Sequence, residues 1–379
     1  MLSVGIMSGT SLDGVDVALC EILGSGTDTS VRLIEFDTYD LPQAIQEKVR
    51  QCAANEFIRP ADLSSLNFEL GELFADGVKQ ICQKARIETT ELDFVASHGQ
   101  TIYHHPFPNN EYVANTMQLG ESGVIAARCG CTVISDFRVI DVALGGQGAP
   151  LVPYSEYVVY ADKNKSRGLQ NLGGIGNITI VPNTMDSNDI VAFDTGPANM
   201  MIDSAMKHYF QKNYDKGGES ALSGEFIPQL QAELKGHPYL KLPIPKSTGR
   251  EMFGDDYVAS ILERYKSSKA EDVVATLTWF TAYCISYHYY EYVEKIHTLD
   301  ELIISGGGSH NKAIRKYLSE LMPEVSILVQ EDIGFNSDAK EAIAFVILAN
   351  ETLHKQPSNV LSATGASKPA ILGKIQYAP

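Results

Sequence analysis

Apolar and polar residues alternate near the start of the chain in a pattern that predicts a β-hairpin. An apolar run at 4–7 leads into a polar tip at 8–14, and the alternating run 15–19 follows. The tip contains an Asp-Gly pair, which strongly favours a turn between two strands. Another strand is predicted at 31–39, so the chain opens with a three-stranded meander.

The same order of elements returns in the second half of the chain. A strand, a glycine-rich tip and a second strand are predicted over 169–180, with a third strand at 190–193 and a helix at 199–209. Residues 3–55 follow the same plan, although the two stretches share few residues. Because self-similarity on this scale indicates duplication, we interpret the chain as two copies of one unit, one in each of two lobes.

Short apolar runs and helical periodicity predict the remaining elements. Residues 215–254 are expected to form mainly polar turns and loops, and 154–160 to connect the two lobes. The further strands are predicted at 94–96, 116–119, 132–135 and 302–304, and the further helices at 43–54, 60–86, 122–129, 276–292, 311–321 and 341–353.

Length and composition indicate a folded protein with an acidic surface. The 379 residues suffice for two ordinary domains, and 44% of them are hydrophobic. The formal charge of −17 argues against binding to nucleic acid in general. The six cysteines include no CxxC pair, which favours buried thiols in a reducing compartment. With no signal peptide or membrane span in the sequence, we expect a cytoplasmic protein.

Three glycine-rich tips, at 8–14, 173–177 and 305–309, each follow a short apolar strand. Backbone N–H groups in such loops converge on anions, and glycine allows close approach. The first tip alone is equally compatible with a plain turn. Three tips, the last of them leading into a helix, indicate a nucleotide held between lobes. No GxxxxGK motif lies near these strands, so the phosphate site is not a P-loop.

Carboxylates near the tips are candidates for catalysis and metal binding. Asp194 follows the strand 190–193 and could be the general base that phosphoryl transfer commonly needs, or cap the next helix. Asp13 and Asp16 flank the first tip and could reach magnesium through water, although Asp13 could equally stabilise the turn. Glu341 opens a predicted helix, where it complements the dipole and could also hold magnesium.

Other polar clusters suit a sugar. His98 and Gln100 fall in the loop expected after the strand 94–96, although a lone histidine is more often structural. Arg138 could contact an anion or a sugar, or form a structural ion pair. Residues 246–251 concentrate cationic and hydroxyl groups and form either a loop over the cleft or a solvated turn.

Nine stretches of the chain, in the expected order, resemble the anhydro-N-acetylmuramic acid kinase family, a branch of the actin, sugar kinase and heat-shock-chaperone ATPase superfamily. They are MSGTSLDGVD (7–16), SHGQT (97–101), DFR (136–138), GGQGAPLVP (145–153), NLGGIGNI (171–178), FDTGPAN (193–199), PKSTGRE (245–251), SGGG (305–308) and SATGA (362–366).

The resemblance implies a two-lobed, actin-like ATPase fold of the α/β class, built from duplicated RNase H-like βββαβαβα units. The N-terminal lobe would comprise 1–150 joined by 355–379, and the C-terminal lobe 151–354. The implied reaction uses ATP and Mg²⁺ to open 1,6-anhydro-N-acetylmuramic acid with water and to phosphorylate O6. The products would be N-acetylmuramic acid 6-phosphate and ADP, in cell-wall recycling. The resemblance also implies a homodimer.

Specific roles follow from the same resemblance. Asp194 would take a proton from the attacking water, and Glu341 would lie near the metal. The implied nucleotide residues are Gly9, Thr10, Ser11, Leu12, Asp13, Gly14, Val15, Asp16, Gly173, Gly174, Asn177, Gly306, Gly307 and Gly308. The implied sugar residues are His98, Gln100, Asp136, Arg138 and Gln147.

Two stretches depart from the family's pattern. Arg138 is followed by Val139-Ile140 where two further arginines are expected, and 154–156 reads Tyr-Ser-Glu in place of an Ala-Phe-His-like run. Both bear on contacts to the acidic lactyl group of the sugar. A non-catalytic sensor and an ordinary sugar kinase remain alternatives, but the presence of Asp194 and of all three tips favours the enzyme.

Overall fold

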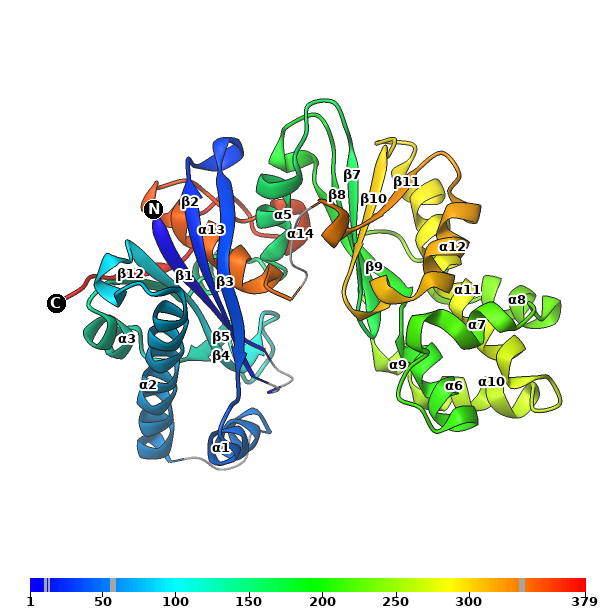
Figure 1. Ribbon diagram of the computed structural model, residues 1–379, viewed down its shortest axis with the longest axis horizontal. Coiled ribbons are helices and arrows are strands. Elements are labelled where there is room, and N and C mark those ends of the chain that lie inside the picture. Colours follow the sequence, from blue (N-terminus) through cyan, green and yellow to red (C-terminus); the bar gives the residue numbers. More distant parts are fainter. Residues whose placement is uncertain (10–11, 13, 55–58, 334–337) are drawn as a thin grey trace. The chain divides into compact units, whose positions relative to one another are not determined.

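The computed structural model describes residues 1–9, 12, 14–54, 59–333 and 338–379 (Figure 1). Thr10, Ser11 and Asp13 of the first predicted tip therefore lie outside the described residues. The chain divides into two compact units. Unit 1 comprises Met1–Val159 together with Asp338–Pro379, and unit 2 comprises Tyr160–Ser337.

Unit 1 is built on a seven-stranded sheet in which β12-β6-β4-β1-β2-β3 lie in that order and β5 pairs with β4. β1, β2 and β3 form the predicted antiparallel meander, and β4 is parallel to both β1 and β6. The strands are β1 (Leu2–Ser8), β2 (Val15–Leu23), β3 (Ser30–Tyr39), β4 (Phe94–His105), β5 (Asn115–Leu119), β6 (Thr132–Ser135) and β12 (Lys374–Gln376).

Helices pack on both faces of this sheet (Figure 1). Val4 and Ile6 of β1 join a buried cluster with residues of α2. Gly5, between them, faces α13 so closely that an added Cβ would lie 2.0 Å from the carbonyl oxygen of Ala342. The helices are α1 (Gln43–Ala53), α2 (Pro60–Ala85), α3 (Ser122–Cys129), α4 (Val139–Ala143), α5 (Val152–Tyr160), α13 (Lys340–Leu353) and α14 (Leu361–Thr364).

Unit 2 repeats the same design with a five-stranded sheet, in the order β11-β10-β7-β8-β9. β7, β8 and β9 form an antiparallel meander, and β10 is parallel to both β7 and β11. This matches β6-β4-β1-β2-β3 strand by strand and confirms the predicted duplication. The strands are β7 (Arg167–Leu172), β8 (Ile175–Val181), β9 (Val191–Pro197), β10 (Glu301–Ser305) and β11 (Ser326–Val329).

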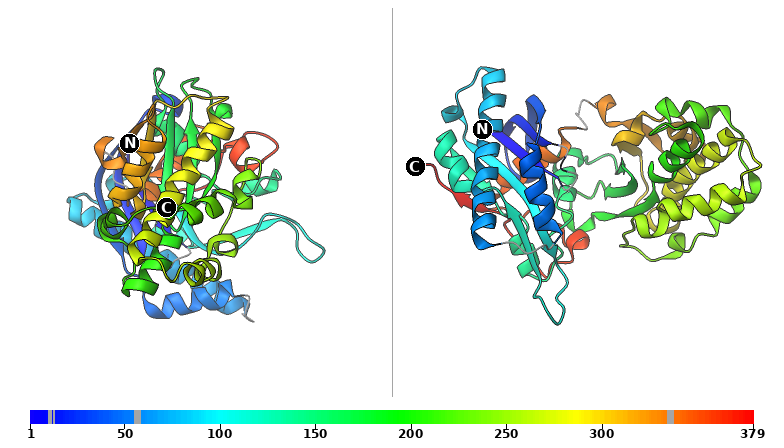
Figure 2. Two further views of the ribbon diagram at one scale, coloured as in Figure 1. Left: turned by 90° about the vertical axis from the view of Figure 1, so that its right-hand side faces the viewer. Right: turned by 90° about the horizontal axis from the view of Figure 1, so that it is seen from below.

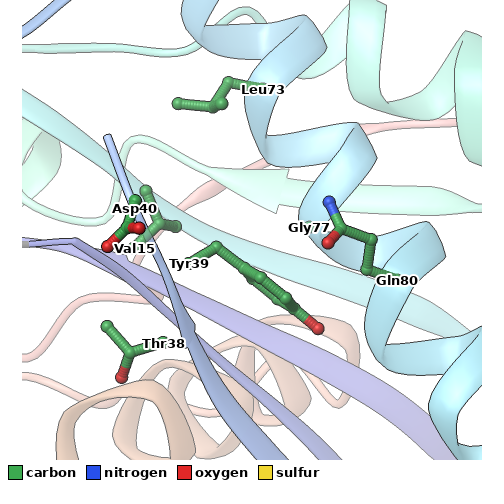
Figure 3. Close-up of a pocket in the computed structure, with 7 residues that line it drawn as sticks. All are labelled: Val15, Thr38, Tyr39, Asp40, Leu73, Gly77 and Gln80. Carbon is green, nitrogen blue, oxygen red and sulfur yellow. The ribbon is translucent and has the colours of Figure 1, made fainter. Parts of the chain in front are cut away.

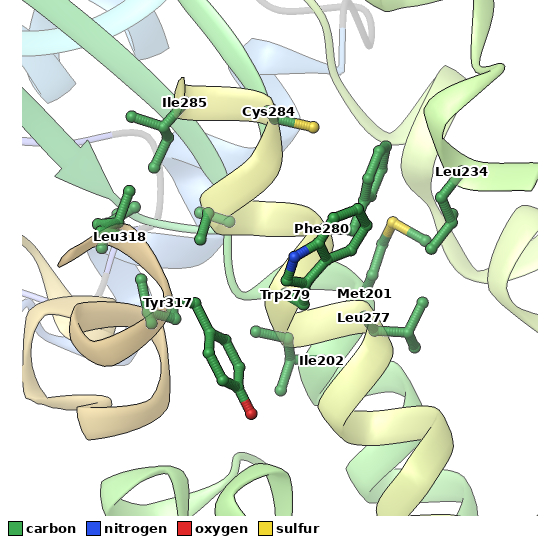
Figure 4. Packing of buried hydrophobic residues seen from close by; sticks show 14 of the residues in the cluster. Met201, Ile202, Leu234, Leu277, Trp279, Phe280, Cys284, Ile285, Tyr317 and Leu318 are labelled. Atoms are coloured by element: carbon green, nitrogen blue, oxygen red, sulfur yellow. The ribbon is translucent and has the colours of Figure 1, made fainter. Parts of the chain in front are cut away.

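The helices of unit 2 enclose one large apolar core. Figure 4 shows Met201 and Ile202 of α6 packed near Trp279 and Phe280 of α11, with Leu318 of α12 nearby. The aromatic residues of α11 are thus mainly core. The helices are α6 (Met200–Phe210), α7 (Glu219–Ser223), α8 (Pro228–Lys235), α9 (Arg250–Phe253), α10 (Asp255–Arg264), α11 (Ala270–His288) and α12 (Lys312–Leu321).

Several local expectations were wrong. Residues 215–254 contain the short helices α7, α8 and α9 in place of a series of loops, because a few buried residues, such as Leu230 and Leu234, suffice to anchor them. β4 continues through 97–105 and pairs there with β5, so His98 lies in a strand. Asp194 lies within β9 rather than after it.

The borders of the two units also differ from those expected at 150 and 355. α5 and α13 pack with unit 1, which places Glu341 there as well. The β4–β5 hairpin extends away from the rest of unit 1 (Figure 2), and Phe107 and Val113 at its tip are exposed. Within the described ranges, no helix is both long and apolar enough to cross a bilayer.

Candidate functional site

The first hairpin tip is anchored by a buried glutamine from β4. Ser8 Oγ donates to Gln100 Oε1 at 2.6 Å, and Gln100 Nε2 donates to the carbonyl oxygen of Gly9 at 3.3 Å. Both side chains are fully buried, so these bonds fix the point where β1 enters the tip. Leu12 has a φ of 60°, and an added Cβ at Gly14 would lie 2.6 Å from Cγ2 of Thr38.

Carboxylates gather at the base of this hairpin. Thr38 Oγ1 donates to Asp16 Oδ1 at 2.6 Å, while burial and the charge of Asp338 raise the pKa of Asp16. Glu341, in the first turn of α13, keeps solvent access, but the surrounding protein and the charge of Asp16 raise its pKa. A bound cation would relieve this repulsion, and carboxylate oxygen is the donor that magnesium prefers.

The donor set for a metal is nevertheless incomplete. Among the described residues, no group of three or more His, Cys, Asp or Glu side chains is placed to hold a metal ion. Asp16 and Glu341 would supply carboxylate oxygens to a magnesium ion, which usually keeps several of its waters in proteins. Lys340, beside Glu341, pairs with the buried Glu156 of α5 at 2.5 Å and so ties the start of α13 to unit 1.

Arg138 and His98 form a buried pair. Arg138 Nε and Nη2 lie 3.1 and 2.9 Å from His98 Nε2, and Nη1 donates to the carbonyl oxygen of Gly148 at 2.7 Å. Burial and the charge of Arg138 lower the pKa of His98 to about 3, so the ring is neutral and accepts at Nε2. Within the described part of the chain, Arg138 forms no direct ion pair, but the charge of Glu341 acts on its guanidinium and opposes the lowering of its pKa by burial.

Asp141 connects the glycine-rich loop 145–148 to the C-terminal segment, and sequence reasoning gave it no role. Its Oδ2 accepts from the N–H of Gly148 at 2.7 Å, and its Oδ1 accepts from Asn359 Nδ2 at 2.9 Å and from Thr364 Oγ1 at 2.8 Å. The carboxylate is fully buried. Asp141 thus holds together two of the stretches that carry the family resemblance.

Two other predicted sugar residues lie near this loop or at the end of β6. Gln147 is exposed, and its N–H donates to the carbonyl oxygen of Thr364 at 2.7 Å. Asp136 has a φ of 58° and pairs with Lys374 at 3.1 Å. Gln147 therefore lies in the loop whose Gly148 carbonyl binds Arg138, whereas the carboxylate of Asp136 pairs with Lys374 of β12.

A cavity of about 330 Å³ lies between β3 and α2 in unit 1 (Figure 3). Of the predicted site residues described by the structure, only Val15 lines it, next to Thr38, the hydrogen-bond partner of Asp16. Its lining residues are Val15, Thr38, Tyr39, Asp40, Leu73, Gly77 and Gln80.

In unit 2 the second tip closes on the start of α6. The backbone N–H groups of Ala198 and Met200 donate to the carbonyl oxygen of Gly174 at 3.0 and 3.1 Å. Asn199 donates through its N–H to the carbonyl oxygen of Gly173 at 2.9 Å and through Nδ2 to that of Leu172 at 2.8 Å. The backbone of this tip is therefore held rigidly at a helix N-terminus.

The third glycine run lies against the same tip. An added Cβ at Gly308 would be 2.7 Å from Cβ of Leu172 and 2.8 Å from Oδ1 of Asn199. Gly306 has a φ of 77°, and its Cβ would meet Oδ1 of Asn171 at 2.6 Å. The structure thus places Gly306–Gly308 against the second tip, which contains Gly173 and Gly174. Asn311 caps the following helix, α12.

Asp194 lies on β9 opposite Asn177 of β8, close to the loop 245–249. Its Oδ2 accepts from the N–H of Thr248 at 2.9 Å, and its N–H donates to the carbonyl oxygen of Lys246, also at 2.9 Å. Burial is the main cause that raises the pKa of Asp194; the charge of Glu251 adds to it, and the Thr248 bond opposes it. A half-buried carboxylate with a raised pKa is suited to accept a proton.

Sequence comparisons identify relatives of the whole chain. The family model for anhydro-N-acetylmuramic acid kinase matches residues 1–378. The chain is 49% identical to an anhydro-N-acetylmuramic acid kinase from Clostridioides difficile (strain 630) and 48% identical to one from Bacillus cereus (strain AH187). Each match covers 100% of this chain and 99% of the relative.

Among solved structures, an activator of 2-hydroxyisocaproyl-CoA dehydratase from Clostridium difficile shares only 12% of its residues with this chain, with a TM-score of 0.46. That match covers 94% of this chain and 96% of the activator, and it is too weak to support an argument. The sequence matches are far stronger, since they run over the full length and include the residues around Asp194. The chain therefore belongs to the anhydro-N-acetylmuramic acid kinase family.

Proposed function

We propose that this protein opens 1,6-anhydro-N-acetylmuramic acid with water and phosphorylates O6 at the expense of ATP. The products are N-acetylmuramic acid 6-phosphate and ADP, and the reaction serves cell-wall recycling. The observation that carries the proposal is the state of Asp194. Its carboxylate is fixed by Thr248, is half-buried, and has a raised pKa, all within a chain that is 49% identical to a named kinase of this type.

In the proposed reaction, Asp194 accepts a proton from a water molecule, and the water oxygen forms a bond to the anomeric carbon. The bond between that carbon and O6 breaks, and O6 leaves with its electron pair. O6 then attacks the γ-phosphorus, and the bond from the γ-phosphorus to the bridging oxygen breaks to release ADP. Because Thr248 occupies Oδ2 of Asp194, Oδ1 is the oxygen available for the proton.

The glycine-rich segments supply the nucleotide site. We assign the phosphates to the described parts of the first tip (Gly9, Leu12 and Gly14–Asp16) and to the second tip with Asn177, and the adenosine to Gly306–Gly308. Thr10, Ser11 and Asp13 remain part of the proposed phosphate site. The positive end of the α6 helix dipole favours negative charge, which suits ATP in a protein with a net charge of −17. Magnesium, bound through Asp16 and Glu341, would neutralise charge on the phosphates.

For the sugar, Arg138 is the strongest candidate contact. Its guanidinium is held by a neutral histidine and a backbone carbonyl, and it forms no direct ion pair with a described carboxylate, although the charge of Glu341 acts on it. Its positive charge can therefore still pair with an anion. The lactyl carboxylate of the substrate is such an anion, and guanidinium pairs well with carboxylate. His98 and Asp141 would then serve chiefly to hold Arg138 and the neighbouring backbone, and Gln100 to hold the first tip. Asp136 and Gln147 stay in the proposal as sugar contacts.

We extend the proposal to a homodimer that works in the bacterial cytoplasm. All six cysteines are buried and free, as expected where thiols stay reduced. Sedimentation velocity at several protein concentrations tests the dimer.

The reaction itself is tested in ¹⁸O-labelled water. The protein is incubated with ATP, magnesium and 1,6-anhydro-N-acetylmuramic acid, and the product is reduced at once with borohydride so that the oxygen on C1 cannot exchange. We expect one labelled oxygen at C1 and none in the transferred phosphoryl group. Phosphorylated product without label at C1 would contradict hydrolytic ring opening and favour an ordinary sugar kinase. Absence of any product would favour a sensor.

A further inference from the structure

The ammonium group of Lys246 is held by three backbone carbonyl oxygens. Nζ lies 2.9 Å from the oxygen of Tyr239, 3.2 Å from that of Leu240 and 2.9 Å from that of Leu242. These carbonyls lie at or just beyond the short 3₁₀ helix Pro238–Lys241. That of Tyr239 also accepts from the N–H of Leu242, and that of Leu240 also accepts from the hydroxyl of Tyr292. Because an ammonium has three N–H donors, this arrangement uses all of them.

Two aromatic rings complete the surroundings of this ammonium. Nζ lies 4.6 Å from the ring centroid of Tyr239 and 5.1 Å from that of Tyr292, within the range of cation–π attraction. Across the described ranges, Lys246 pairs with no carboxylate. Burial lowers its pKa to about 8, which agrees with a side chain that is turned inward. Lys246 is thus a structural cation inside unit 2 rather than part of a solvated turn.

The backbone on either side of this lysine holds Asp194. The carbonyl oxygen of Lys246 accepts from the N–H of Asp194, and the N–H of Thr248 donates to Asp194 Oδ2, both at 2.9 Å. Tyr239 links the lysine to the aspartate, because its hydroxyl donates to the carbonyl oxygen of Asp194 at 2.6 Å. The same tyrosine therefore contacts the lysine through its ring and its carbonyl, and contacts the aspartate through its hydroxyl.

We propose that Lys246 is a positioning residue for Asp194: its ammonium, bound to Tyr239, Leu240 and Leu242, fixes the loop 245–249 so that Thr248 holds one oxygen of the carboxylate and leaves the other free for the proton. This inference rests on the proposed function, in which Asp194 is the base. Without the anchor, the loop loses its attachment to the Pro238–Lys241 segment, and the Thr248 N–H moves away from the carboxylate.

The charges and hydrogen bonds around Asp194 determine the direction in which its pKa moves when the Thr248 bond is lost. Glu251 of α9 faces the carboxylate with a like charge and raises its pKa, as burial does, whereas the Thr248 N–H lowers it. Three further groups lie nearby. Tyr239 has a neutral phenol, Asn177 has a neutral amide, and the ammonium of Lys246 is turned toward carbonyls. Loss of the Thr248 bond therefore raises the pKa of Asp194, and the base becomes protonated at a higher pH.

The test is Lys246→Met, which keeps the length of the side chain and removes its charge and donors. We expect kcat to fall by about 10- to 100-fold, as misplacement of a catalytic group does. KM for ATP should stay within about twofold, because the glycine segments are untouched. The acid limb of kcat/KM should move up by about one pH unit, which corresponds to loss of one charge-assisted hydrogen bond.

Lys241→Met is the matched control, since Lys241 is exposed, lies in the same segment and contacts no described partner; its kinetics should equal those of the unaltered protein. Lys246→Gln provides a milder second variant if Lys246→Met does not fold, as judged by circular dichroism. A fall in kcat with an unmoved acid limb in the folded variant would indicate general disruption and overturn the proposal, as would unchanged kcat.

Asp194→Asn, measured in parallel, separates this inference from the proposed function. If Asp194→Asn keeps near-normal turnover, Asp194 is not the base, and both assignments fail together. If Asp194→Asn is inactive while Lys246→Met has an unaltered kcat and acid limb, only the positioning role fails.

Discussion

The two hairpins of this protein occupy equivalent places in two sheets of the same strand order, yet they carry their acidic residue on different strands. In unit 1, Asp16 of the middle strand β2 pairs in register with Thr38 of the edge strand β3. In unit 2, the equivalent middle-strand residue is Asn177, and its partner on the edge strand β9 is Asp194. At this register position, unit 1 has the carboxylate on the middle strand and a neutral side chain on the edge strand, and unit 2 has them the other way round.

This exchange separates two kinds of chemistry. Asp16 lies near Glu341 and Asp338, and the mutual repulsion of such carboxylates suits a hydrated cation. The carboxylate of Asp194 instead accepts from the N–H of Thr248, in a loop whose lysine side chain is turned toward carbonyls. A half-buried carboxylate that has a raised pKa and no ion pair among the described residues suits proton transfer. On the proposed function, the exchange of this one register pair accounts for the different roles of the two units.

The largest expected effect comes from Asp194→Asn, which removes the proposed base and keeps its shape. We expect turnover to fall by about 10²- to 10⁴-fold, the usual contribution of a general base, with little change in KM for ATP. Steady-state kinetics with both substrates checks this. Turnover close to that of the unaltered protein would show that Asp194 is not the base.

The next largest effect is expected at the third glycine run. In Gly308→Ala, the new Cβ would meet Leu172 and Asn199 at under 3 Å, so the second tip must shift. We expect KM for ATP to rise by about tenfold or more, equivalent to about 1.4 kcal/mol of lost binding. Gly307→Ala is the matched variant, because its nearest neighbour would be 3.9 Å away, and its effect should be clearly smaller. Equal effects would contradict the steric argument.

A smaller effect on KM for ATP is expected when one side-chain anchor is removed from either hairpin tip. Gln100→Leu leaves Ser8 and the Gly9 carbonyl without their partner and should raise KM for ATP about five- to tenfold. Asn199→Ala removes one side-chain bond but leaves the backbone bonds of the second tip in place, so we expect about a two- to threefold rise. Titration with a non-hydrolysable ATP analogue measures the affinity of both variants. A larger loss of affinity in Asn199→Ala than in Gln100→Leu would contradict this difference between the tips.

The smallest expected effect is a pH shift in Glu251→Gln. Glu251 raises the pKa of Asp194, so removing its charge lowers that pKa. Because the base must be ionised, the acid limb of kcat/KM should move to lower pH, by about a few tenths of a unit for an exposed neighbour. High salt should reduce the difference between the two proteins. An upward shift, opposite to that expected for Lys246→Met, would contradict this electrostatic picture.

Much of the fold could be predicted because its signals are local. The Asp-Gly turn between alternating strands predicted the first hairpin, and the recurrence of the same plan near residue 169 predicted the second unit. β4 was predicted too short because Ser97, His98 and Gly99 are typical of a loop. In the structure this stretch is buried in the sheet, and Gly99 has a φ of 78° where the pairing with β1 changes register.

The site was harder to predict because its contacts join distant parts of the sequence. Asp141 binds Asn359 and Thr364, more than 200 residues away, and nothing near Asp141 in the sequence indicates either partner. The cation-rich loop at 246–251 was recognised, but its link to Asp194 spans about 50 residues. Residue types therefore predicted the candidates, whereas the partners of each depended on the three-dimensional packing.

The close contact between Gly5 and Ala342 has a consequence for how the chain is made. Unit 2 is continuous in sequence, so all of it leaves the ribosome before α13 does. Unit 1 instead needs its first strand and one of its last helices together, and β1 keeps one apolar face uncovered until synthesis is almost complete. Domains generally fold as units during synthesis. The N-terminal half of the protein is therefore the part whose folding is completed last, and the part most in need of protection from aggregation while the chain grows.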